Sequence, residues 1–205
     1  MTNRYSVYDL SKVSDDDWVK LVSALSPAPN SLAQRSAALD CAARYVRKKL
    51  RARTLIVQRD VEDPDFLAEH AAYYYQWSYS VPKYCVRLHF FDQAPPASLD
   101  VISTTDAMAQ VRSSYLGFIT LRPVRLSPVA ATILRTPSTT WSYTTCCDSF
   151  PVNLAGQTFV VNGTPFMQQD NAVGACAQAS IWMALRTLRR RLAHSAYSTA
   201  QSPHA

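Results

Sequence analysis

The chain has 205 residues, of which 48% are hydrophobic and 18% are charged, and its formal net charge is +6 at pH 7. This composition excludes disorder for most of the chain and is typical of a globular protein with a sizeable core. No stretch reaches the roughly 18 consecutive apolar residues of a membrane helix, and residues 1–18 lack the basic and apolar regions of a secretory signal. We therefore expect a cytoplasmic protein that does not enter a membrane.

Cysteine and histidine usage argues against disulfides and metal sites. The number of cysteines is odd, and no pair has the Cys-x-x-Cys spacing of oxidoreductases or zinc sites. The histidines are scattered, the four glycines form no phosphate-binding loop, and the sequence has no HExxH motif. We predict no metal and no cofactor. The cysteines are Cys41 and Cys85, interpreted as core residues, the adjacent Cys146 and Cys147, interpreted as packed or exposed thiols, and Cys176.

Two helices are predicted near the N-terminus. Ser14 and the three aspartates after it indicate a helix that ends before Pro27, because serine caps a helix and acidic residues favour its first turn. A second helix is predicted from Asn30 or Ser31 to residue 53, with its basic residues at the favourable C-terminal end. This helix places four apolar residues near one face: Leu32, Leu39, Ala43 and Val46.

Strands dominate the middle of the chain. The segment at 54–61 is short and β-branched, which is typical of a strand, and Asp63-Pro64-Asp65 then indicates the start of a third helix. After Pro82, short runs rich in Val, Ile, Thr, Tyr and Phe alternate with turn residues. The strands predicted there lie at 85–91, 115–124, 130–136, 139–145 and 157–163.

The last predicted element is a helix over 176–193. Its large apolar residues recur at intervals of four, three and four, which is the spacing of a buried helical stripe. The segment after this helix has almost nothing to bury, so we expect a disordered tail at 194–205. The predicted stripe consists of Ile181, Leu185, Leu188 and Leu192.

The order of these elements indicates an α+β fold: N-terminal helices, a β-rich middle and a C-terminal helix that carries Cys176. We predict a helical and mixed region at 1–94 and a β-rich region with the final helix at 95–193. The Pro-Pro-Ala-Ser segment at 95–98 is the candidate boundary between them. A single domain that includes both regions is the alternative.

Cys176 is the candidate nucleophile of the sequence. It lies in the first turn of the predicted final helix, directly after a loop that contains Gly174. The positive end of the helix dipole and the unpaired backbone N–H groups there favour a thiolate, which is the nucleophilic form. Gln168 and Gln169 precede it by seven or eight residues, and an amide beside a nucleophile can donate a hydrogen bond to an oxyanion. The alternative interpretation is a small hydrophobic residue at the base of an amphipathic helix.

The segment GTPFMQQDNAVGACAQASIWMAL at 163–185 resembles the nucleophile segment of papain-like cysteine peptidases, and is most similar to bacterial, bacteriocin-processing members. The resemblance implies that Cys176 is the nucleophile and Gln169 the oxyanion donor of a hydrolase, a peptidase or amidase acting on a peptide or protein. The interval from Gln169 to Cys176 is one residue longer than usual in that family. Residues 53–125 also resemble parts of uncharacterised bacterial proteins, without an attached activity.

A general base for Cys176 is harder to find. His194 would lie roughly 27 Å along the same helix, and His204 lies in the predicted tail. We therefore expect the chain to be a fragment that ends before its base and is inactive alone. The alternative is a circularly permuted arrangement in which His89, on the predicted strand at 85–91, supplies the imidazole. Asp148 or Asp170 would then orient it.

A noncatalytic interaction module is the alternative function. It would bind an acidic partner or nucleic acid through basic helix ends, aided by the tyrosine run at 73–75 and Trp77. Cations are also expected at helix C-termini without any ligand, so we do not expect nucleic acid. An incomplete fold would in addition favour self-association. The basic clusters are Arg47, Lys48, Lys49, Arg51 and Arg53, and Arg186, Arg189, Arg190 and Arg191.

Overall fold

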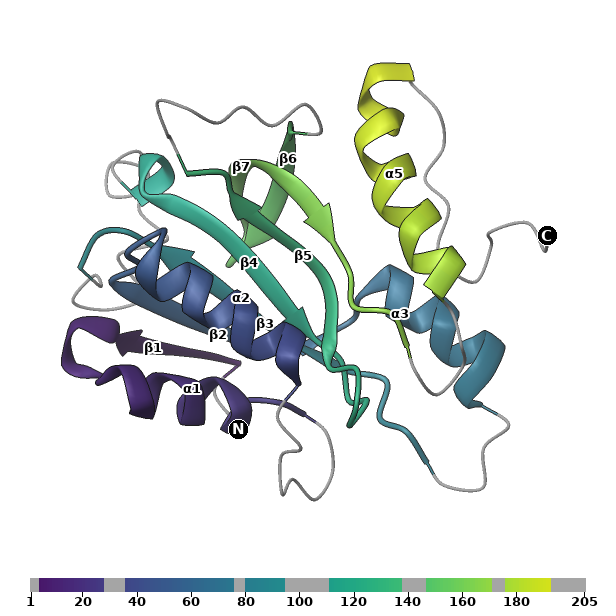
Figure 1. Cartoon of the computed structure of the whole chain (residues 1–205), viewed down its shortest axis with the longest axis horizontal. Helices are drawn as coiled ribbons and strands as arrows, with labels where there is room; N and C mark the ends of the chain where they lie inside the picture. The colour runs from purple at the N-terminus through teal and green to yellow at the C-terminus, as the bar shows by residue number, and fades with distance from the viewer. Residues whose placement is uncertain are drawn as a thin grey trace.

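The protein is α+β, as predicted, and is built on one antiparallel sheet with the strand order β1-β2-β3-β4-β5-β7-β6 (Figure 1). The computed structural model describes residues 4–27, 36–75, 80–94, 111–137, 147–170 and 176–192. The strands are β1 (Tyr5–Asp9), β2 (Thr54–Val61), β3 (Cys85–Phe91), β4 (Tyr115–Leu121), β5 (Val129–Arg135), β6 (Asp148–Leu154) and β7 (Gln157–Phe166). The helices are α1 (Asp15–Ala24), α2 (Ala37–Lys48), α3 (Pro64–Glu69) and α5 (Cys176–Leu192), with short turns η1 (Leu10–Lys12) and η2 (His70–Tyr74).

The starts of α1 and α3 are those that the sequence predicts. Ser14 Oγ accepts a hydrogen bond from the Asp17 N–H at 3.2 Å, and Asp63 Oδ1 accepts one from the Phe66 N–H at 3.2 Å. Each cap satisfies a backbone donor that has no partner within its helix. Capping therefore fixes where the chain enters both helices.

α2 differs from its prediction at both ends. Its N-cap is Ser36, and it ends at Lys48 rather than at residue 53. The φ of Arg51 is 54°, a left-handed conformation that a right-handed helix does not contain. Three of the four residues predicted on its apolar face are buried, namely Leu39, Ala43 and Val46, and Leu32 lies outside the described residues.

α1 and α2 cover one face of the sheet and form its main core (Figure 1). Alternate residues of the central strands, such as Leu88 and Phe90, point toward these helices because successive side chains of a strand lie on opposite faces. Trp18 of α1 packs edge-on against Phe90, and its indole N–H donates to the Ala43 carbonyl at 2.9 Å. This face of the sheet is therefore apolar and covered.

Two glycines allow β4 and β7 to approach β5 closely. A Cβ at Gly117 would lie 2.2 Å from the Ile133 carbonyl oxygen, and a Cβ at Gly163 would lie 2.1 Å from that of Leu134. No larger residue fits at either distance, and Gly117 also has a φ of 115°.

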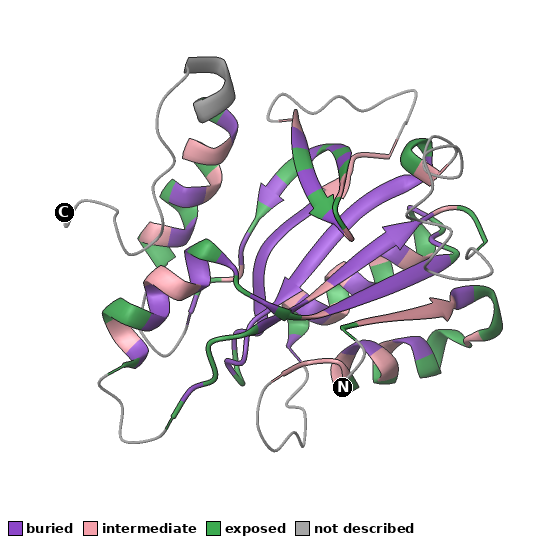
Figure 2. Cartoon of the chain, turned by 180° about the vertical axis from the view of Figure 1, so that it is seen from behind, coloured by how far each residue is buried: buried purple, intermediate pink, exposed green. Residues whose placement is uncertain are grey.

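The β6–β7 hairpin, which precedes Gly163 in the chain, folds over the second face of the sheet. β7 pairs with β5 from Gly163 to Phe166, and the preceding part of β7 pairs with β6. Phe159 of this part lies 5.0 Å from the Tyr115 ring and 5.7 Å from the Phe91 ring, between centroids. A second apolar cluster therefore forms between the hairpin and the sheet, on the side that Figure 2 views.

α5 packs against β7 and Ala131 through a face that differs from the predicted one. Ile181 is 40% exposed and Leu188 is 42% exposed, whereas Trp182 is buried against Met167. The prediction of a buried Ile181, Leu185 and Leu188 stripe is therefore wrong: Leu185 is half-buried, and the indole of Trp182 occupies the contact instead. The side chain of Leu192 lies outside the described residues.

The sequence pattern does not predict β1 or β6, which are the two edge strands of the sheet. All residues of β1 are half-buried, so it lacks a clear alternation, and β6 contains Pro151, which edge strands tolerate. The strand predicted at 139–145 lies outside the described residues. The other predicted strands are confirmed.

Both predicted regions contribute to the same sheet. β3, from the region at 1–94, pairs with β4, from the region at 95–193, over the length of both strands. The candidate boundary at 95–98 and the predicted tail at 194–205 lie outside the described residues. Among the described residues, no helix is long and apolar enough to cross a membrane.

Candidate functional site

Cys176 is exposed and is the first residue of α5. Its carbonyl accepts a hydrogen bond from Ser180 Oγ at 3.1 Å, within the first turn of the helix. The first backbone N–H groups of a helix have no intrahelical partner, so they are directed toward the surroundings of this residue. The loop at 171–175 that precedes Cys176 lies outside the described residues.

The two glutamines before Cys176 have different environments. Gln168 is fixed by three partners: its Oε1 accepts from Ser36 Oγ at 3.1 Å and from the Val129 N–H at 3.3 Å, and its Nε2 donates to the Leu126 carbonyl at 3.1 Å. Gln169 is exposed, and Asp170 after it is buried. Gln168 is therefore a structural residue, whereas Gln169 is an exposed residue shortly before Cys176 in the sequence.

A buried arginine holds the chain at the start of this loop. Arg122 donates from Nη2 to the Gln168 carbonyl at 2.9 Å, from Nε to the Ser127 carbonyl at 2.7 Å and from Nη1 to Glu69 Oε2 at 2.7 Å. Arg122 and Glu69 are both buried. The guanidinium thus ties together α3, the turn between β4 and β5, and the segment after β7.

His89 lies on β3, as predicted, but it is fully buried. Its Nδ1 lies 3.0 Å from Tyr115 Oη and its Nε2 lies 3.1 Å from Gln58 Oε1. Burial lowers the pKa of His89 well below 6.5, and the nearby charge of Arg87 lowers it further. Both ring nitrogens are engaged by neutral groups, so neither Asp148 nor Asp170 orients this imidazole.

The other described histidine is also committed to the fold. His70 is buried in η2, and its Nε2 lies 2.8 Å from the Val81 carbonyl oxygen. His194 and His204 lie outside the described residues. Within the described ranges, no imidazole is therefore placed to serve Cys176.

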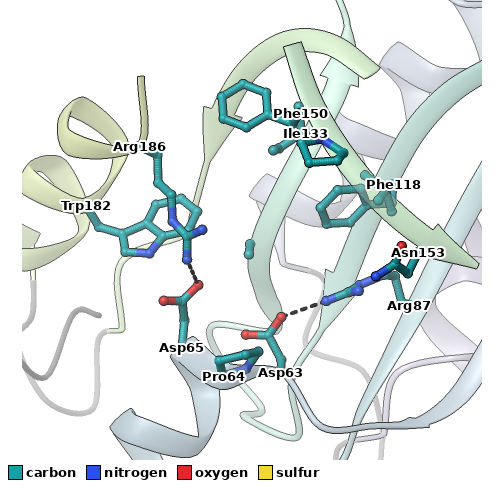
Figure 3. Close-up of a pocket in the computed structure, with 13 residues that line it drawn as sticks. Asp63, Pro64, Asp65, Arg87, Phe118, Ile133, Phe150, Asn153, Trp182 and Arg186 are labelled. Carbon is teal, nitrogen blue, oxygen red and sulfur yellow. Dashed lines mark hydrogen bonds and ion pairs between the residues drawn. The ribbon is translucent and has the colours of Figure 1, made fainter. Parts of the chain in front are cut away.

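A cleft of about 740 Å³ opens on the second face of the sheet, between α3, α5 and the β6–β7 hairpin (Figure 3). Its apolar wall includes Phe118, Ile133 and Phe150, from three different strands. α5 contributes Trp182 and Arg186 from the opposite side. Cys176 belongs to the same helix but is not one of the residues that line this cleft.

Two arginine–aspartate pairs lie in the cleft. Arg87 Nη2 donates to Asp63 Oδ2 at 2.8 Å, and Arg186 Nη2 donates to Asp65 Oδ2 (Figure 3). Burial raises the pKa of Asp65 above its ordinary value, and the Arg186 charge opposes that shift. The sequence indicated Asp63 and Asp65 only as a helix start. The missed signal was Arg87, a charged residue on the largely buried strand β3.

The remaining cysteines are placed as follows. Cys85 is buried, as predicted, and burial raises the pKa of its thiol. Cys41 is exposed on α2, so its interpretation as a core residue is wrong. Cys147 is half-buried and accepts a hydrogen bond from Thr136 Oγ1 at 3.8 Å, while Cys146 lies outside the described residues. Among the described residues, no group of His, Cys, Asp or Glu is arranged to hold a metal ion.

The basic helix ends are partly used by the fold itself. Arg47 donates to the carbonyls of Leu10 at 2.6 Å and Val13 at 2.7 Å, and pairs with Asp15 at 3.1 Å. Arg186 lines the cleft. Trp77 and the side chains of residues 189–191 lie outside the described part of the chain. In the tyrosine run, Tyr74 is buried. Several members of the proposed acidic-partner surface are thus engaged inside the protein.

Comparison with known proteins gives no relative. No family model matches the chain, and neither a curated protein nor a solved structure is significantly similar to it.

Proposed function

We propose that the chain carries the nucleophile segment of a papain-like cysteine hydrolase that acts on amide or related acyl bonds. The observation that supports it best is the position of Cys176, exposed at the first residue of the 17-residue helix α5. The glutamine-containing segment before it is anchored by Arg122 and Gln168 rather than loosely attached. This position is where a nucleophilic thiolate gains from the helix dipole.

The proposed reaction proceeds by acyl transfer. The Cys176 thiolate attacks the carbonyl carbon of the substrate, and the oxygen of the tetrahedral intermediate accepts hydrogen bonds from backbone N–H groups at the start of α5 and from Gln169. The C–N bond breaks, the amine leaves with a proton, and a thioester remains on Cys176. Water then hydrolyses the thioester and restores the thiol.

The proton transfers need an imidazole. His70 and His89 are both buried and bonded elsewhere. The base therefore has to come from residues outside the described ranges or from another chain. His89 is better assigned to the fold, where it links β3 to Gln58 of β2 and Tyr115 of β4.

An activated ester tests the nucleophile without the missing acid, because p-nitrophenolate leaves without needing a proton. We expect p-nitrophenyl acetate to acetylate Cys176 about tenfold faster than Cys41, which is also exposed, as read by mass spectrometry of the peptides. Cys176→Ser should abolish the fast release of p-nitrophenolate, and Cys41→Ser should leave it unchanged. Equal acetylation of the two thiols would contradict the proposal.

A further inference from the structure

We infer that the cleft between α3, α5 and the β6–β7 hairpin binds a small organic carboxylate with an apolar body. The inference rests on the residues that line the cleft and does not depend on Cys176. Its volume of about 740 Å³ falls within the range of roughly 300 to 1,000 Å³ that small-molecule sites occupy. Aromatic and aliphatic walls with a few charged groups are typical of such sites.

Arg87 presents one uncommitted end to the cleft. Its Nε donates to Thr120 Oγ1 at 3.2 Å and its Nη2 to Asp63, while its guanidinium lies 4.9 Å from the centre of the Phe118 ring. These contacts hold the guanidinium in one orientation, and the side chain is only 17% exposed. Within the described part of the chain, its hydrogen bonds are made by Nε and Nη2, and its Nη1 has no hydrogen-bond partner there.

Arg186 lies across the cleft from Arg87 (Figure 3). Like Arg87, it pairs with an aspartate and stacks on an aromatic ring. Its Nη2 donates to Asp65, and its guanidinium lies 4.9 Å from the centre of the Trp182 ring. Its Nε is buried and, among the described residues, has no hydrogen-bond partner. The Arg186 side chain is 28% exposed, so a ligand in the cleft can reach the outer end of its guanidinium, although the enclosed Nε is not accessible.

These donors suit a carboxylate attached to an apolar group. A guanidinium fixed by stacking and one ion pair can still offer an N–H to an anion, in a charge-assisted hydrogen bond. The rings of Phe118 and Phe150 would contact the apolar body of the ligand. Because Asp63 and Asp65 neutralise the two arginines, the cleft has no excess charge to attract a polyanion.

An extended peptide is a poor occupant, although β6 is an edge strand beside the cleft. The two-residue turn Ala155-Gly156, with φ of 50° and 78°, makes Leu154 and Gln157 a hydrogen-bonded pair. Pro151, three residues before Leu154, then occupies a position whose N–H would point to the open edge. Proline has no N–H, so it removes a donor that an added strand would need.

The experiment compares 3-phenylpropionate with its neutral analogue 3-phenylpropionamide. Both are titrated into the ¹⁵N-labelled chain, with the Trp182 indole N–H signal as readout, assigned through Trp182→Phe. We expect the carboxylate to shift this signal and to bind about tenfold more tightly than the amide. Equal affinities, or no shift with either ligand up to on the order of ten millimolar, would overturn the inference.

Variants locate the anion subsite. The double variant Asp65→Asn/Arg186→Gln removes the ion pair without leaving a buried charge, and we expect it to weaken carboxylate binding about tenfold while amide binding is unchanged. Arg125→Gln, at an exposed arginine outside the cleft, is the matched control and should bind normally. Cys176→Ser should also bind normally, so this test and that of the hydrolase fail independently. Undiminished binding by the double variant would place the carboxylate elsewhere and contradict the inference.

Discussion

α2 and α5 are both amphipathic helices with an exposed cysteine near their N-termini, yet the fold uses them differently. α2 lies across the sheet and buries Leu39, Ala43 and Val46 in the main core. α5 contacts β7 at the margin of the sheet, buries Ala179 and Trp182, and keeps Leu188 exposed. Cys176 is the first residue of α5, whereas Cys41 lies one turn into α2, which is why Cys176 rather than Cys41 is the candidate nucleophile.

The largest expected difference between the two helices concerns stability. Leu39 is 4% exposed, so Leu39→Ala should lower the free energy of unfolding by about 4 kcal/mol, through lost burial and a residual cavity. Leu188→Ala, on the exposed side of α5, should change it by less than about 0.5 kcal/mol. Urea unfolding measures both. Similar losses from the two variants would show that α5 is as much a core helix as α2.

The segment that leads to α5 is held by the buried Arg122, which binds Glu69 and the Gln168 carbonyl, whereas α2 is held by apolar contacts. Glu69→Gln leaves the buried Arg122 without its counter-charge, so we expect a loss of about 3 kcal/mol in unfolding free energy. Glu62→Gln is the control: this glutamate is exposed and lies two residues before α3 begins at Pro64, so its replacement should be nearly neutral. An unchanged midpoint for Glu69→Gln would contradict the anchoring role of Arg122.

The sheet face turned away from α2 should give the protein a pH dependence. His89 stays neutral when folded, whereas in the unfolded chain it takes up a proton below about pH 6.5, so stability is present above that pH and is lost as the pH falls. Between about pH 6.5 and about pH 5, the wild type should lose about 1.6 kcal/mol more than His89→Gln. Chemical denaturation at the two pH values measures this difference, and parallel losses in both proteins would contradict it.

The smallest expected effect concerns the hairpin opposite α5. Ala155 has a φ of 50°, a left-handed conformation that asparagine tolerates better than alanine. Ala155→Asn should therefore raise the free energy of unfolding by about 0.5 to 1 kcal/mol. Ala155→Val, with a branched Cβ at the same position, should lower it instead. Thermal unfolding distinguishes the two variants, and a loss in the asparagine variant would contradict the turn assignment.

Much of the fold could be predicted because its signals are local. Ser14 and Asp63 are capping residues at the positions where α1 and α3 begin, and the strand predicted at 54–61 has the bounds of β2. The edge strands β1 and β6 could not be predicted in this way. Half-burial weakens the alternation of β1, and Pro151 disguises β6.

The candidate site was predictable only where it lies within one segment. Cys176 and Gln169 are close in sequence, so their pattern could be read directly. The cleft instead joins Asp65 to Arg186, which are 121 residues apart, and no local pattern brings them together. The exposure of Cys41 likewise depends on how α2 meets the sheet and not on the residues beside it.

The most direct test of the account is the alkylation rate of each cysteine with iodoacetamide from about pH 5 to about pH 9, read by mass spectrometry. Cys41 provides an exposed reference on α2, and the buried Cys85 should remain unlabelled. We expect Cys176 to react faster than Cys41, because the unpaired backbone N–H groups in the first turn of a helix favour a nucleophilic thiol. Equal alkylation rates for Cys176 and Cys41 would contradict the proposed role of Cys176 as a nucleophile.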